Sequence, residues 1–177
     1  TEYSAGGLPV RVTDPAGTVT ETVYDGAGRK LRDTVKIPGG TDIVTEYAYD
    51  ANGNVTSTTL KNALGGGDQT TVTAYDARNR VISVTDPEGN TAYTAYDANG
   101  NKIRETDPAS NVTDYEYDAA NRLVKTVFPA VYDGETGTTR RPETTNVYDR
   151  RGLVVSSTDV RGTTTTNEYD ILGRQVK

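Results

Sequence analysis

The residues of this 177-residue chain that could do chemistry are its carboxylates. The chain has no His and no Cys, which excludes Ser–His or Cys–His nucleophiles, disulfides and thiolate metal sites within it. Two segments, beginning at Asp50 and Asp97, read Asp-Ala-Asn-Gly-Asn and are similar to the first half of a calcium-binding loop. Such a loop needs Gly at position 6 and Glu at position 12, whereas Gly stands at position 4 here and position 12 is Lys61 or Pro108. A hairpin turn is therefore the better interpretation.

Paired carboxylates remain a possible general acid and base, because the chain has 25 Asp and Glu residues. Almost every Asp, however, stands at a position that a turn explains. We therefore expect no catalytic residue, no metal site, no cofactor and no enzymatic activity.

The acidic residues belong to a unit that recurs along the whole chain. Copies begin near residues 3, 24, 49, 75, 96, 117, 148 and 169, most often 21 residues apart, with Tyr first, Asp usually second, and Gly or Asn four residues after the Tyr. A fixed period marks a repeat architecture. We expect these motif positions to have a structural role: Tyr3, Tyr24, Asp25, Gly28, Tyr49, Asp50, Gly53, Tyr75, Asp76, Asn79, Tyr96, Asp97, Gly100, Tyr117, Asp118, Asn121, Tyr148, Asp149, Gly152, Tyr169, Asp170 and Gly173.

Each copy predicts two strands and two turns. In the first turn, Asp accepts a hydrogen bond from the backbone two residues on, and Gly or Asn takes a positive φ. A strand follows, then a second turn such as Asp86-Pro87-Glu88-Gly89, which suits type I geometry. A Thr-rich strand then returns to the next Tyr.

The sequence thus predicts an all-β fold, a repetitive antiparallel array of β-hairpins over residues 1–177. About 16 strands at ~4.8 Å would give a sheet that twist forces to curl, with Tyr columns stacked as cross-strand pairs. Disorder is the competing interpretation, because only about 18% of residues are Val, Ile, Leu or Phe. The 12 Tyr and 30 Thr residues and the net charge of only −6 favour strands instead.

Three copies are expanded, each at its second turn: the loops at 36–43, 61–69 and 129–142. If successive hairpins stack in the same sense, these loops emerge along one edge of the sheet, where repeat proteins often place binding loops. The three glycines within 61–69 predict a mobile loop.

Charge and hydropathy limit the partners. A net charge of −6 with scattered Lys and Arg gives no basic stripe for nucleic acid. No apolar run approaches the ~20 residues of a membrane span. Because the chain starts and stops within repeats, we expect a fragment of a longer protein, and its end strands could self-associate.

Segments such as Tyr24-Asp25-Gly26-Ala27-Gly28-Arg29 and Tyr169-Asp170-Ile171-Leu172-Gly173-Arg174, together with the Thr-Asp-Pro-x-Gly that follows other copies, resemble the YD repeat of the Rhs family. That family includes bacterial polymorphic toxins, C components of insecticidal toxin complexes, wall-associated proteins and teneurins. The resemblance implies a secreted or cell-surface protein in which the repeats form a spiral β-shell around a C-terminal cargo domain. We find no counterpart of the family's self-cleavage segment.

Two functions follow. The first is a structural scaffold, a wall segment of a hollow β-shell that encapsulates a toxin or other cargo, with the remainder of the same polypeptide as partner. The alternative is an extracellular adhesion module that binds glycan or protein through the Tyr-rich face and the three inserted loops.

Overall fold

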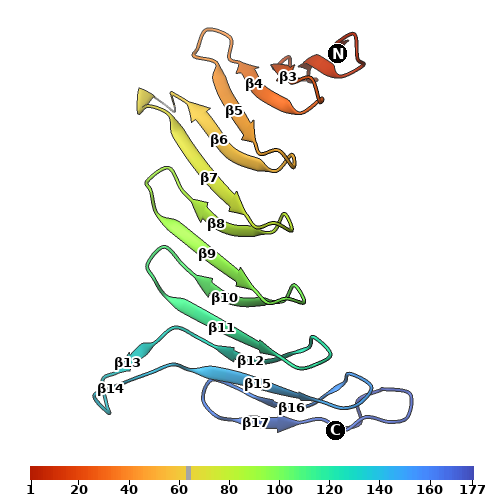
Figure 1. Ribbon diagram of the computed structural model, residues 1–177, viewed down its shortest axis with the longest axis vertical. Coiled ribbons are helices and arrows are strands. Elements are labelled where there is room, and N and C mark those ends of the chain that lie inside the picture. The colour runs from red at the N-terminus through yellow and green to blue at the C-terminus, as the bar shows by residue number, and fades with distance from the viewer. Residues whose placement is uncertain (63–64) are drawn as a thin grey trace. The chain divides into compact units, whose positions relative to one another are not determined.

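The computed structural model describes residues 1–62 and 65–177, which form strands joined by turns (Figure 1). The 61–69 loop, for which the sequence predicts mobility, contains the two residues, 63 and 64, that lie outside the described ones. The strands are β1 (Glu2–Tyr3), β2 (Pro9–Thr13), β3 (Val19–Tyr24), β4 (Lys30–Lys36), β5 (Ile43–Tyr49), β6 (Val55–Lys61), β7 (Gln69–Tyr75), β8 (Val81–Thr85), β9 (Thr91–Tyr96), β10 (Lys102–Thr106), β11 (Val112–Tyr117), β12 (Leu123–Val127), β13 (Val131–Asp133), β14 (Thr138–Arg140), β15 (Glu143–Tyr148), β16 (Val154–Thr158) and β17 (Thr164–Thr166).

Fifteen of these strands form one sheet whose order follows the chain, and β13 and β14 form a separate two-stranded sheet. Neighbouring strands pair antiparallel throughout each hairpin. The predicted all-β array of hairpins is therefore confirmed. The chain divides into two compact units, residues 1–91 and 92–177, with the boundary at the start of β9. Both units are built from the same repeat, and the assignment of residues 1–177 to a single array stays a prediction.

A β-bulge follows the first turn of each repeat. In the first unit, Val23 lies opposite Arg32 but Tyr24 lies opposite Lys30, so Leu31 is the extra residue. The same shift in register recurs beside Tyr49, Tyr75, Tyr96, Tyr117 and Tyr148. Because a bulge adds a residue to one strand and increases local twist, each hairpin twists just after its Tyr-Asp turn.

The register shows that the predicted Tyr–Tyr cross-strand stack is wrong. Each motif Tyr lies opposite a residue of its own hairpin, as Tyr49 does opposite Val55. Since only every second strand ends in a motif Tyr, consecutive ones are two strands apart, about 9.6 Å at the usual spacing. Contacts between repeats must therefore be made in another way.

Neither unit has a conventional hydrophobic core. Among the described residues no hydrophobic side chain is buried, and the buried polar residue is Thr126, at 9% exposure. Within each unit the strands form one layer (Figure 1). Neighbouring strands are joined instead by main-chain ladders and by Thr pairs, such as the 2.9 Å hydroxyl contact between Thr59 and Thr70.

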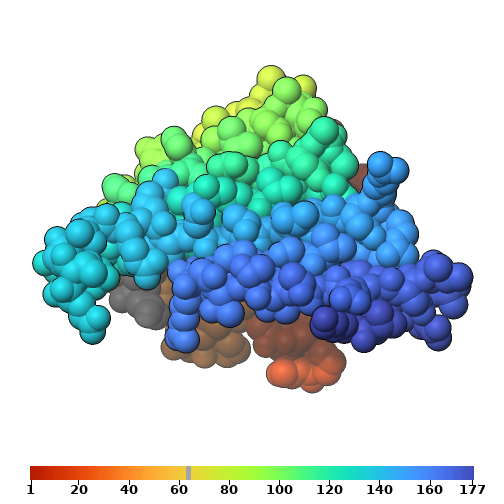
Figure 2. Space-filling model, turned by 90° about the horizontal axis from the view of Figure 1, so that it is seen from below, coloured from red at the N-terminus to blue at the C-terminus, as the bar shows by residue number. Residues whose placement is uncertain are grey.

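The insertion at 129–142, for which the sequence predicts only a loop, contains a pair of strands. Val131, Tyr132 and Asp133 of β13 pair with Arg140, Thr139 and Thr138 of β14. This hairpin projects from the second unit (Figure 2). Its turn is closed by a 2.9 Å hydrogen bond from Gly137 N to the Asp133 carbonyl. Gly134 follows Tyr132 by two residues and Gly137 by five, whereas the motif has Gly or Asn at four. Each strand has only three residues, so neither the motif nor a strand pattern predicted the hairpin.

The first two expanded loops, 36–43 and 61–69, lie on the same edge of the first unit. Thr41 and Asp42 of one loop and Lys61 and Asn62 of the other line a common cavity with Leu60. No helix in the described part of the chain is long and apolar enough to cross a membrane.

Candidate functional site

The Tyr-Asp turns have one backbone geometry in both units. At Asp25, the amide of Gly28 donates to the Asp25 carbonyl at 3.0 Å, and the Asp25 amide donates to the Arg29 carbonyl at 2.9 Å. The positive φ that the sequence predicts is present at every position of the turn column, between 59° and 101°. These positions are Gly7, Gly28, Gly53, Asn79, Gly100, Asn121, Gly152 and Gly173.

The Asp side chain holds the whole turn together. Oδ1 of Asp25 accepts from the amides of Ala27 and Arg29, both at 2.9 Å, and Oδ2 accepts from Nε of Arg29 at 2.7 Å. The sequence predicts the contact two residues on, whereas the contacts four residues on were not predicted. The hydrogen bonds from the amide and then the guanidinium of Arg29 lower the pKa of Asp25. The pKa is lowered likewise at Asp50, Asp76, Asp97, Asp118, Asp149 and Asp170.

The second turns repeat this arrangement without the Tyr. Asp86 accepts from the amide of Asn90 through its carboxylate at 2.8 Å, and its carbonyl accepts from Gly89 N at 3.0 Å. The fourth residue of these turns has a positive φ even where it is Ser110, with φ 66°. In the Tyr-Asp turns and in the second turns alike, the Asp carboxylates thus accept hydrogen bonds from backbone amides.

The motif tyrosines join each hairpin to the preceding one. Tyr49 donates its hydroxyl proton to the Lys30 carbonyl at 2.7 Å, and Lys30 stands six residues after the preceding motif tyrosine, Tyr24. The acceptor has this same place in the preceding repeat for Tyr24, Tyr75, Tyr117, Tyr148 and Tyr169, at 2.9–3.0 Å. The expected ring stacking is thus replaced by a hydrogen bond from a half-buried phenol to a main-chain carbonyl of the neighbouring strand, which belongs to the preceding repeat.

Arginine adds a second link between adjacent repeats. The guanidinium of Arg29 lies 4.7 Å from the ring centroid of Tyr49 and donates to the Asp50 carbonyl at 3.4 Å. Arg122 makes the same pair of contacts in the second unit, 4.6 Å from the Tyr148 ring and 2.9 Å from the Asp149 carbonyl. Each such Arg therefore bonds its own Asp and reaches the next Tyr-Asp turn.

Asparagine forms the alternative link. Nδ2 atoms of Asn52 and Asn54 donate to Oδ1 of Asn79 at 3.0 and 2.7 Å. In the second unit, Asn99 and Asn101 donate to Oδ1 of Asn121 at 3.0 and 2.8 Å. The turn column has Asn instead of Gly at positions 79 and 121, and both follow a copy that reads Asn-Gly-Asn. This co-occurrence is visible in the sequence, but the repeat motif by itself predicts only a positive φ for the two Asn residues.

A network of charged and phenolic groups lies next to the motif tyrosines. Asp33 accepts from Thr22 at 2.6 Å, from Lys30 at 2.9 Å and from the hydroxyl of Tyr47 at 3.3 Å. Partial burial would raise the pKa of Asp33, but these hydrogen bonds outweigh it and lower the pKa. Lys102, Glu105 and Tyr115 form the corresponding network in the second unit.

The carboxylates of the motif Asp residues make hydrogen bonds within their own turns. Asp50 and Asp97, the residues that begin the two calcium-loop-like segments, use their carboxylates in hairpin turns. In the described part of the chain no three Asp or Glu residues are grouped so that they could hold a metal ion. The turn aspartates accept hydrogen bonds and the tyrosine hydroxyls donate them within the sheet.

Comparisons with known proteins agree with this geometry. The family model described as Teneurin YD-shell matches residues 8–177. No curated protein matches the chain. A structure of a Photorhabdus luminescens Tc holotoxin pore with a mutated TccC3 matches 99% of this chain at a TM-score of 0.69 and 19% identity. The TcdB2-TccC3-Cdc42 and TcdB2-TccC3-TEV crystal structures match 96% and 99% of it at TM-scores of 0.41 and 0.40, with 17% and 16% identity.

The chain spans 10–12% of the length of those matched chains, and the likeness to the holotoxin shows the shared fold alone. The family model, in contrast, spans nearly the whole chain, and the Tyr-Asp turns described above recur along that span. With the sequence motif, the hairpin geometry and the family model in agreement, the chain belongs to the teneurin YD-shell family.

Proposed function

We propose that this chain is a wall segment of a hollow β-shell that encloses a toxin or other cargo domain of the same polypeptide. The family is a shell scaffold, so the coarse function is structural. The observation that carries the proposal is the single-layer sheet: among the described residues no hydrophobic side chain is buried, yet neighbouring repeats are tied together by Tyr, Arg and Asn side chains. Such a layer suits a wall more than a compact binding domain.

The mechanism is exclusion. Strands ~4.8 Å apart, with their main chains paired, leave no gap that another polypeptide can enter. The side-chain links at the Tyr-Asp edge keep adjacent hairpins in register without a second layer. A cargo behind the wall would be separated from proteases and from the solvent outside.

The partners and location follow from this role. The main partner is the remainder of the same polypeptide, including the enclosed cargo, and the parent is a secreted or cell-surface protein. The match to a Tc holotoxin pore, which is by its title a toxin assembly, supports this setting.

The test is protease protection of the cargo in the full-length parent protein. Purified parent is incubated with a nonspecific protease, and the fragments are identified by mass spectrometry. We expect the segment downstream of the shell to resist cleavage, and to become sensitive in a Gly100→Val variant, whose turn needs a φ of 101°. Arg150→Ala, at an exposed position, is the matched control. A cargo that is cleaved equally in all three proteins would reject encapsulation.

The adhesion alternative is less well supported by the geometry of the Tyr column. From Tyr24 onward the motif rings are half-buried. The hydroxyls of Tyr49 and Tyr148 donate to main-chain carbonyls, and an arginine guanidinium lies over each of these two rings. They therefore offer a sugar little open ring surface. An adhesive role would have to reside in the inserted loops.

A further inference from the structure

Two of the chain's 11 asparagines precede a glycine: Asn52 precedes Gly53, and Asn99 precedes Gly100. The other nine precede residues that have a Cβ. Because glycine has none, its main-chain nitrogen is the least shielded from the side-chain amide of the residue before it. All four residues are exposed to solvent, so water reaches both amides. An Asn-Gly pair of this kind can cyclise, because the glycine nitrogen can attack the asparagine side chain.

The nitrogen that would attack is held by its own turn. In the second unit, the Gly100 amide donates to the Asp97 carbonyl at 3.2 Å. In the first unit, the Gly53 amide donates to the Asp50 carbonyl at the same distance. Each of these bonds must break before the nitrogen can lose its proton, so the folded turn slows the attack.

The nitrogen that would leave is held by the next repeat. Nδ2 of Asn99 donates to Oδ1 of Asn121 at 3.0 Å, and Nδ2 of Asn52 donates to Oδ1 of Asn79 at 3.0 Å. A side chain fixed at its end in this way cannot bring its Cγ to the glycine nitrogen until that bond breaks. The link between repeats is therefore also a restraint on the reaction.

We propose that Asn52 and Asn99 are sites of deamidation, at a rate set by the asparagine link to the next repeat. The Gly100 nitrogen loses its proton to hydroxide and forms a bond to Cγ of Asn99. The Cγ–Nδ2 bond then breaks, and ammonia leaves with a proton from water. A second water molecule opens the cyclic imide at either carbonyl, which leaves Asp or isoAsp at position 99. The same steps apply to Asn52 and Gly53, and none of them depends on encapsulation.

Deamidation would break the link that restrains it. Oδ1 of Asn121 accepts from Asn99 at 3.0 Å and from Asn101 at 2.8 Å. An ionised carboxylate at position 99 is only an acceptor, so it cannot replace the first of these bonds. If the Asn121 amide turned over, its nitrogen would meet that carboxylate but would also face Nδ2 of Asn101. One of the two bonds is lost in either orientation, so the modified hairpin is joined less firmly to its neighbour.

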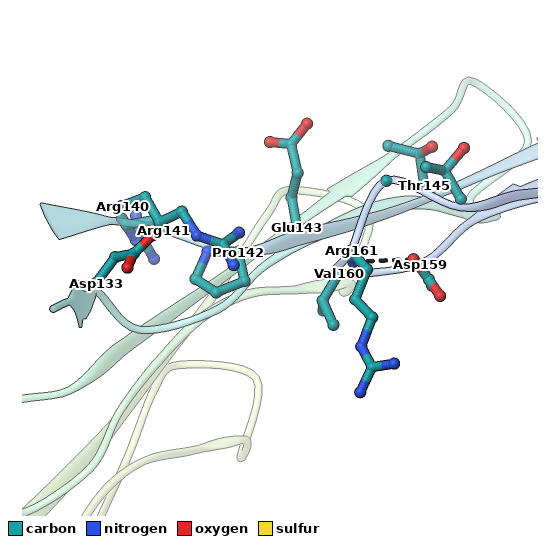
Figure 3. A pocket seen from close by; sticks show the side chains of 11 residues that line it. Asp133, Arg140, Arg141, Pro142, Glu143, Thr145, Asp159, Val160 and Arg161 are labelled. Carbon is teal, nitrogen blue, oxygen red and sulfur yellow. Dashed lines mark hydrogen bonds between the residues drawn. The ribbon is translucent and has the colours of Figure 1, made fainter. Parts of the chain in front are cut away.

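Two Asp-Gly pairs, Asp25-Gly26 and Asp133-Gly134, could form the same cyclic imide. Their carboxylates are held in the ionised form. The amide of Glu135 donates to Asp133 at 3.0 Å and lowers its pKa, and Asp133 lies beside Arg140 (Figure 3). A negatively charged carboxylate is a poor electrophile, so we expect these two pairs to react more slowly than the two Asn-Gly pairs.

The test compares the folded 177-residue chain with its Asn121→Gly and Asn79→Gly variants at mildly alkaline pH. Both variants keep the positive φ and lose the acceptor. Peptide mapping by mass spectrometry follows Asp and isoAsp at every asparagine. In the wild type we expect products first at Asn52 and Asn99. Asn121→Gly should speed the reaction of Asn99 about two- to tenfold, as expected for the loss of one hydrogen bond, and leave that of Asn52 unchanged. Asn79→Gly should do the reverse, so each site is the control for the other.

Three results would overturn the proposal: equally fast reaction at other asparagines, an unchanged rate at Asn99 in Asn121→Gly, or acceleration of both sites by one variant. The last would show a general loosening of the fold. Far-ultraviolet spectra check that the variants are folded. Asn79→Asp and Asn121→Asp, which keep an acceptor oxygen, form a second pair of variants. They should deamidate at the wild-type rate, and faster reaction in them would also count against the link.

Discussion

At the scale of the residue, one turn position has two separate duties. Gly28 and Gly100 supply only a positive φ, whereas Asn79 and Asn121 also accept two side-chain hydrogen bonds from the preceding repeat. Asn can have both duties because it tolerates the left-handed region and carries an amide oxygen. The identity of the turn residue therefore reports which kind of link joins two repeats.

Replacing Gly100 by Val tests the backbone duty. A β-branched residue at a φ of 101° is strained, and we expect a loss of about 1–3 kcal/mol in the free energy of unfolding. Gly134→Val is the control, because that Gly has no positive φ and open space where a Cβ would be. Thermal denaturation of both variants measures the difference. Equal melting temperatures for the two variants would contradict the assigned turn.

Replacing Asn79 by Gly tests the linking duty. The positive φ is preserved while the acceptor for Asn52 and Asn54 is removed, so we expect a loss of about 1 kcal/mol. Combining it with Asn54→Ala gives a double-mutant cycle, which should show a favourable coupling energy between the two side chains. Strictly additive effects would mean that the amide contacts add nothing to stability.

At the scale of the element, the hairpins were predictable because their signals are local. Asp at one position and Gly or Asn three residues later specify the turn within four residues, and the Thr- and Val-rich segments on both sides favour strands. The inserted β13–β14 pair was missed because its Tyr132-Asp133 turn is one residue longer than the motif. The links between repeats were missed because their partners stand 15–27 residues apart, as Tyr117 and Lys102 or Arg122 and Asp149 do.

The position of the inserted hairpin should depend on Arg141. Arg141→Ala removes its bonds to Asp114 and to three carbonyls. We expect faster amide hydrogen exchange in β13 and β14, while exchange in β15 and β16 changes little. Arg140→Ala, one residue earlier, should leave exchange as in the wild type. Unchanged protection of the hairpin in Arg141→Ala would show that the hairpin is held by other contacts.

At the scale of the whole molecule, stability is distributed over many equivalent turns instead of a buried core. The composition predicted a sparse core, and the described residues contain no buried hydrophobic side chain. The sequence could not predict which edge contacts replace the core, since the carbonyl that each motif Tyr reaches on the neighbouring strand depends on the register between repeats. The links then explain how a one-layer sheet holds adjacent repeats in register.

The dependence of stability on pH follows from the turn aspartates. Hydrogen bonds to the ionised form lower the folded-state pKa of Asp25, Asp76 and Asp118. A lowered pKa stabilises the fold above the unfolded-state pKa of about 4, and this contribution is lost as the pH falls through the folded-state value. With no His in the chain, we expect a flat melting temperature from about pH 5 to 8 and a decline below about pH 4. A transition near pH 6.5 would contradict this account.

The central claim is that these repeats form the wall around an enclosed cargo. The most direct test is an electron cryo-microscopy map of the full-length parent protein. We predict that residues 1–177 appear as a one-layer wall, with solvent on one face and an internal volume on the other that contains another part of the same polypeptide. A map in which both faces are exposed to solvent, or in which a packed second layer covers one of them, would contradict the claim.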